Sequence, residues 1–75
     1  MQRTILRNLD RYHLGMMPVT TLFADCQLDL PGTTYTDFRS ACSELEFKGQ
    51  ILLIQGEDRL KAKITDAGRA RLLGN

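Results

Sequence analysis

The spacing of apolar residues changes at Gly49, and this change restricts the fold more than any other feature of the 75-residue sequence. Over residues 35–45, apolar side chains recur at spacings of three, four and three, which places them on one face of a helix. Residues 50–54 are instead a short β-branched and apolar run, and residues 60–64 alternate between apolar side chains and lysine. Such alternation is typical of a strand with one buried face. The sequence therefore predicts an α+β fold, mainly helical, in which a β-hairpin follows the helices.

Helices are expected on both sides of a short extended segment near the N-terminus. The first helix ends near Gly15, because glycine tolerates the left-handed conformation that follows many helices. Met16 and Met17 then run into Pro18 in an extended conformation, because the residue before a proline avoids the helical region. A second helix is predicted to cover roughly residues 20–28.

A turn separates the second helix from a third. Residues 28–32 contain a proline and a glycine, which do not continue a helix cheaply, and their leucines are expected to anchor the turn inward. Thr33 and Thr34 are good caps for the start of the third helix. Lys48 and Gly49 are expected to close it, with a cation near the negative helix end and a glycine just beyond.

The C-terminal part is predicted to be a hairpin followed by a short helix. Residues 56–59 form the turn of the hairpin, and Thr65 caps a last helix over residues 66–73. Gly68 lies inside this helix, where glycine costs about 1 kcal/mol relative to alanine. Its presence predicts close packing against a neighbouring element.

Length and composition exclude several classes of protein. A chain of this size has room for one core, so residues 1–75 are expected to form a single domain. No apolar run approaches the roughly 18 to 20 residues of a membrane-spanning helix, and the N-terminus lacks the apolar stretch of a signal peptide. A cytoplasmic protein with no membrane partner is therefore expected. Cys26 and Cys42 are predicted to be reduced thiols on the buried faces of helices.

The residues offer little material for catalysis. His13 is the single histidine of the chain, which leaves no obvious set of metal ligands or acid–base groups. No Cys–His or Ser–His–Asp set can be assembled around it, and no glycine-rich phosphate loop is present in the sequence. We therefore expect no enzyme activity, no cofactor and no metal.

Charge is unevenly distributed although the net charge is only +1. Residues 1–24 carry three arginines against one aspartate, residues 25–47 carry one arginine against five carboxylates, and residues 48–75 carry six cations against three carboxylates. The net charges of the three segments are therefore +2, −4 and +3. Basic ends around an acidic middle suit a polyanionic partner, or they are solvated faces.

Three arginines form a stripe along the first helix. Arg3, Arg7 and Arg11 recur every four residues, which places them on one face. This stripe either contacts a phosphate backbone or an acidic protein, or it is a solvated face. If the stripe is a solvated face, Asp10 is expected to pair with Arg7 or Arg11.

The order of predicted elements resembles a winged helix-turn-helix domain, and two stretches of sequence carry the resemblance further. Residues 38–51, FRSACSELEFKGQI, are similar to the end of a recognition helix that enters the first strand of a wing. Residues 64–69, ITDAGR, resemble the L-T-x-A-G-R step from the wing to the last helix in small bacterial regulators of the MarR and PadR types. The resemblance implies a three-helix core with a two- to three-stranded β-hairpin wing and a C-terminal helix.

The resemblance also implies a function. In that family the third helix enters the major groove of double-stranded DNA and the wing lies along the backbone or minor groove, which implies a DNA-binding transcriptional regulator of a bacterium or phage. Three cations on one hairpin suit phosphate contacts, and hydroxyl groups near a helix start suit phosphates or base edges. The candidate groove residues are Thr33, Thr34, Thr36, Asp37, Arg39, Ser40 and Ser43, and the candidate wing residues are Arg59, Lys61 and Lys63.

The third helix departs from the family pattern because it carries three carboxylates against two cations. Arg39 is its one plausible donor to guanine, and Asp37 near its start would repel phosphate. The alternative interpretation is a winged-helix module for protein–protein interaction or assembly that does not bind DNA. A homodimer is compatible with either interpretation, because association adds burial to a thin core.

Overall fold

The computed structural model describes residues 1–12 and 14–74, and the expectations that concern His13 lie outside these residues. The predicted α+β class, mainly helical, is confirmed by four helices and an antiparallel three-stranded sheet in this part of the chain. The elements, in chain order, are α1 (Gln2–Arg11), β1 (Met16–Pro18), α2 (Val19–Asp29), α3 (Tyr35–Phe47), β2 (Ile51–Gln55), β3 (Leu60–Ile64) and α4 (Asp66–Gly74).

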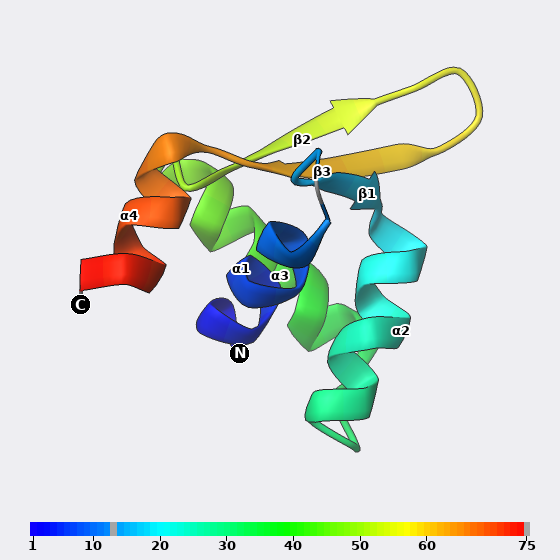
Figure 1. Ribbon diagram of the computed structural model, residues 1–75. Coiled ribbons are helices and arrows are strands. Elements are labelled where there is room, and N and C mark those ends of the chain that lie inside the picture. Colours follow the sequence, from blue (N-terminus) through cyan, green and yellow to red (C-terminus); the bar gives the residue numbers. More distant parts are fainter. Residues whose placement is uncertain (13, 75) are drawn as a thin grey trace.

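The hydrophobic core lies between the sheet and the helices. Figure 1 shows α1, α2 and α3 on one side of the sheet, while its other side carries no helix. Apolar residues of α1, α2 and α3 and the inward side chains of the strands form one cluster of buried residues. The largest fully buried side chains are Phe38, Ile5, Leu6, Leu9, Leu22, Leu45, Ile51 and Ile64.

The first helix ends earlier than predicted. α1 stops at Arg11, and Gly15 lies in the turn that leads to β1, where its N–H donates to the Tyr12 carbonyl at 2.8 Å. Gly15 has a φ of +64°, and a Cβ there would lie 2.7 Å from the guanidinium of Arg69 and 2.8 Å from Ile64. Glycine is therefore required at this position by the left-handed turn and by the close approach of α4.

Both predicted ends of α3 are confirmed. The Thr34 Oγ1 accepts a hydrogen bond from the backbone N–H of Asp37 at 3.1 Å, which caps the helix. At the other end Gly49 has a φ of +76°, and its N–H donates to the Glu46 carbonyl at 2.9 Å. This left-handed glycine satisfies carbonyl groups that the helix end leaves unpaired and turns the chain directly into β2.

β3 is the central strand of the sheet, which has the order β1-β3-β2. The predicted hairpin of β2 and β3 is confirmed, and β1 pairs with the other edge of β3. Ala62 lies between Met17 and Leu53, and these three side chains point toward the helices. Because side chains alternate along a strand, the residues on either side of these three face away from the helices. They form two rows across the strands, Leu52–Lys63–Met16 and Ile54–Lys61–Pro18.

The predicted close packing at Gly68 is confirmed. Gly68 is the buried residue of α4, and a Cβ there would collide with the backbone carbonyl oxygen of Gln50. The same Cβ would lie 2.8 Å from Ile64 and 3.1 Å from Leu6. Glycine therefore allows α4 to pack directly on the junction between α3 and β2.

Two predictions about surface residues are wrong. Asp10 pairs with Arg69 of α4, at 3.2 Å between Oδ1 and Nε, and not with Arg7 or Arg11. The reason is that Asp10 lies on the side of α1 that faces α4. Leu28 is 81% exposed and does not anchor the turn, because α2 continues to Asp29 and keeps Leu28 on the face opposite the core.

Candidate nucleic-acid interface

The exposed face of α3 is a ridge of hydroxyl side chains that ends in an aromatic ring. The buried side chains of α3 are Phe38, Ala41, Cys42 and Leu45. At 3.6 residues per turn, the side chains on the opposite face are Thr36, Ser40, Ser43 and Phe47, and all four are exposed. We call these four residues the α3 ridge. Its side chains carry no charge, and Phe47 is 91% exposed.

An open hollow beside the ridge brings most of the predicted groove residues together. It encloses about 520 Å³, and none of its lining residues is acidic. Its lining residues are Tyr35, Thr36, Arg39, Ser40 and Ser43. Four of the seven candidate groove residues therefore line one hollow.

Thr33 and Thr34 do not line this hollow, and their hydroxyl groups make hydrogen bonds in the turn before α3. The Thr33 hydroxyl donates to the Leu30 carbonyl at 2.7 Å, and the Thr34 hydroxyl accepts the capping bond from Asp37. Both side chains are therefore engaged in hydrogen bonds at the start of α3.

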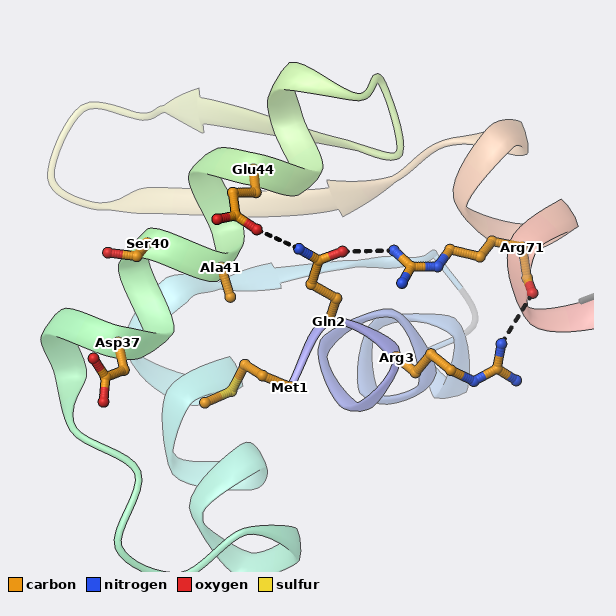
Figure 2. A pocket seen from close by; sticks show the side chains of 8 residues that line it. All are labelled: Met1, Gln2, Arg3, Asp37, Ser40, Ala41, Glu44 and Arg71. Carbon is orange, nitrogen blue, oxygen red and sulfur yellow. Dashed lines mark hydrogen bonds between the residues drawn. The ribbon is translucent and has the colours of Figure 1, made fainter.

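Glu44 is drawn away from the ridge toward α1. Figure 2 shows its carboxylate pointing to Gln2, whose Nε2 donates to Glu44 Oε2 at 2.6 Å. The amide oxygen of the same Gln2 accepts a hydrogen bond from Arg71 of α4 at 2.7 Å. These bonds cross an open groove of about 550 Å³ between α1, α3 and α4. Glu44 is therefore held toward α1 by a polar network between the helices, while its carboxylate stays exposed.

Glu46 and Asp37 have different surroundings. The Oε2 of Glu46 accepts a hydrogen bond from the backbone N–H of Leu53 at 3.1 Å, which ties α3 to β2. Asp37 is exposed near the start of α3 and lines the groove of Figure 2 rather than the hollow at Arg39. Ser40 of the ridge lines the same groove, so the repulsion of phosphate by Asp37 stays a prediction.

Arg39 is a half-buried cation with few polar contacts. Its NH1 donates to the Tyr35 hydroxyl over a long 3.4 Å, and its Cζ lies 6.0 Å from the centre of the Tyr35 ring. Its Nε is buried and has no hydrogen-bond partner in the described part of the chain. The ion pairs found among these residues involve Arg59 and Arg69, not Arg39. Arg39 therefore lines the hollow without a carboxylate paired to it.

The cations of the hairpin occupy mixed surroundings. Lys61 and Lys63 project from the face of the sheet that carries no helix, each between apolar residues of the neighbouring strands. Arg59 lies at the hairpin turn and forms a weak exposed pair with Asp58 at 3.8 Å. The predicted polar face of the hairpin is therefore partly apolar, since Leu52 is 49% exposed and Ile54 is 40% exposed.

The sequence analysis missed Phe47, Leu52 and Ile54 as surface residues. The helical spacing that buries Phe38 and Leu45 places Phe47 on the opposite face, so this signal was present in the pattern. The run over residues 51–54 is wholly apolar and does not reveal which side chains face inward. Pairing with the alternating lysines through a tight turn would have placed Leu52 and Ile54 on the lysine face.

The cysteines are buried in the core, as predicted. Burial raises the pKa of Cys26 and of Cys42 to about 11. Thiols with such a pKa stay protonated at neutral pH and react slowly.

Among residues 1–12 and 14–74, no three histidine, cysteine or carboxylate side chains gather into a metal-binding group. Over the same residues, every helix is too short or too polar to cross a membrane.

The fold and the hollow define a small α+β protein with hydroxyl groups and one unpaired arginine on the outer side of its third helix. No family model, curated protein or solved structure matches this chain. The function is therefore argued from the α3 ridge, the hollow and the hairpin.

Proposed function

We propose that this protein is a winged-helix protein that binds double-stranded DNA and regulates transcription, with α3 as the recognition helix and the β2–β3 hairpin as the wing. The observation that carries the proposal is the distribution of charge around α3. The neutral ridge and Arg39 face outward, whereas Glu44 and Glu46 accept hydrogen bonds from Gln2 and from the backbone of β2. The exposed carboxylates of the helix therefore lie to the sides of the neutral ridge, toward α1 and β2.

The side chains on the ridge suit a DNA groove. Hydroxyl groups of Thr36, Ser40 and Ser43 both donate and accept hydrogen bonds, so they can contact phosphate oxygens or base edges. An exposed phenylalanine such as Phe47 can make apolar contact with a thymine methyl group. A ridge without charge avoids repelling the backbone as the helix enters the groove.

The arrangement of the strands supports the role proposed for the hairpin. The turn at residues 56–59 forms the end of the hairpin farthest from the junction of α3 and β2 (Figure 1). Arg59 lies at this turn, and Lys61 and Lys63 follow along β3. Three cations on an extended arm can neutralise phosphates and release counterions.

The first test is fluorescence anisotropy of a labelled DNA duplex of arbitrary sequence at two salt concentrations. With four phosphate contacts, from Arg39 and the three hairpin cations, the logarithm of affinity falls with the logarithm of salt with a slope of about −3.6. Binding is therefore expected to weaken about a hundredfold between about 50 and about 200 mM salt. Absence of binding at the lower salt concentration would refute the proposal.

A pair of double variants tests the wing. Replacement of Lys61 and Lys63 by alanine should weaken binding to all sequences alike and lower the salt slope by about two. The matched control replaces Arg7 and Arg11 of α1 by alanine, which removes the same charge from another element. An equal effect of the two double variants would mean that binding depends on net charge and not on the hairpin.

One observation favours a second candidate function, a protein-interaction or assembly module without DNA binding. Leu52 and Ile54 expose apolar surface beside Lys61 and Lys63 on the open side of the sheet. The partner under this proposal is another protein or a second copy of the chain. Retention on heparin at moderate salt separates the two functions, because a protein-interaction module without an anion-binding face would not be retained. Light scattering then distinguishes a monomer from a homodimer.

A further inference from the structure

The surroundings of Arg39 suit a ligand that accepts hydrogen bonds from several directions. Arg39 is half-buried, and in the described part of the chain its Nε has no partner and its one polar contact is the long bond to Tyr35. A partly buried charged group with so few acceptors in the protein favours an anion that neutralises it.

Tyr35 lies with its ring under the guanidinium of Arg39, 6.0 Å from Cζ to the ring centre. Its ring packs edge-on against Phe23 of α2, with 5.1 Å between ring centres and 84° between ring planes. It also lies 5.9 Å from the ring of Phe38 in the core. A ring fixed by two aromatic neighbours limits the freedom of an arginine that lies over it, so less conformational entropy is lost on binding.

The other lining groups of the hollow are hydroxyls. Thr36, Ser40 and Ser43 each provide a rotatable O–H donor, and the hollow has no acidic lining residue. A tetrahedral phosphate offers oxygens that accept from several directions at once. The edge of guanine offers two acceptors in one plane, which would use the arginine and leave the hydroxyls around it without a role.

We propose that the hollow at Arg39 binds a phosphate group of the DNA backbone, with Arg39 as the main donor, Tyr35 as its positioning residue and the hydroxyls of Ser40 and Ser43 as further donors. This inference rests on the proposed DNA-binding function and changes the expected role of Arg39 from reading a guanine to fixing the register of α3 on the backbone. The base sequence of the DNA would then be read by Thr36 and Phe47, the remaining residues of the α3 ridge, and not by Arg39.

The first experiment uses inorganic phosphate as the probe and follows the Arg39 Nε–H signal by nuclear magnetic resonance. A saturable shift of this signal is expected with phosphate and not with chloride at equal ionic strength. Tyr35→Phe removes the hydroxyl and keeps the aromatic packing, so it should weaken the phosphate effect. Arg7→Gln removes one cation from α1 and should leave the effect unchanged. A phosphate titration without a saturable shift overturns the proposal.

The second experiment compares Arg39→Gln with the unaltered protein on a set of duplexes that differ in sequence. A phosphate contact predicts the same loss of affinity for every duplex and a salt slope lower by about one. A loss confined to duplexes with guanine at one position overturns the proposal while DNA binding stands. A phosphate-induced shift without binding of any duplex refutes the proposed function and overturns the DNA backbone as the source of the phosphate.

Discussion

Replacement of Gly68 by alanine should destabilise the protein, although alanine is the better helix former. In an open helix position this substitution stabilises by up to about 1 kcal/mol. In α4, however, the new Cβ would collide with the Gln50 carbonyl oxygen and lie 2.8 Å from Ile64. The same carbonyl accepts a hydrogen bond from the backbone N–H of Thr65 at 3.1 Å, so it cannot move without disturbing the end of the hairpin.

The expected magnitude follows from these opposing effects. Overpacking of this kind costs about 1 to 3 kcal/mol, and weakening the backbone hydrogen bond adds about 0.5 to 1.5 kcal/mol. After subtraction of the helix-propensity gain, the free energy of unfolding should fall by about 0.5 to 3.5 kcal/mol. A protein of this size has a total stability of roughly 4 to 11 kcal/mol, so the change is readily measured.

Urea denaturation followed by circular dichroism provides the assay. With a slope of about 1 kcal/mol per molar urea, the midpoint should fall by about 0.5 to 3.5 M. Gly74→Ala is the matched control, because Gly74 belongs to the same helix and a Cβ there would meet nothing within 4 Å. Its midpoint should stay the same or rise. A midpoint for Gly68→Ala equal to or above that of the unaltered protein would refute the packing argument.

Two further predictions concern the cap of α3 and the buried thiols. Thr34→Ala should lower the free energy of unfolding by about 1 kcal/mol because the bond to the Asp37 N–H is lost, and Thr34→Ser should largely restore it in the same urea assay. Burial raises the pKa of both thiols from an ordinary value of 9.0 to about 11, so folding favours their protonated form. This stabilisation is complete below pH 9 and is lost as the pH rises toward 11. The urea midpoint should therefore fall less over this pH range in the double variant Cys26→Ala, Cys42→Ala than in the unaltered protein, and equal falls would contradict the prediction.

Much of the fold could be predicted from the sequence because local signals determine it. The apolar spacing in α3, the cap at Thr34 and the left-handed Gly49 concern residues close together in the chain, and the structure confirms all three. The end of α1 could not be predicted in this way. Gly15 is a turn residue held close to Arg69 of α4, and that contact spans most of the sequence.

The surface around the candidate site was predicted less completely, because part of it depends on how the strands pair. Thr36, Arg39, Ser40 and Ser43 follow from the face of α3 that the apolar pattern leaves exposed. Phe47 belongs to the same face and could have been included by the same pattern. The exposure of the apolar residues in β2 depends on strand register, which a wholly apolar run does not reveal.

The outer surface of α3 is produced by residues that belong to other elements. Gln2 of α1 holds Glu44, and the edge of β2 holds Glu46. Phe23 of α2 supports the ring on which Arg39 lies. Summing the charges of α3 therefore gives a negative helix, whereas the side that faces outward carries hydroxyls, an aromatic ring and an unpaired arginine. The placement of charge around this helix is a property of the tertiary structure, because contacts with α1, α2 and β2 position its carboxylates and Arg39.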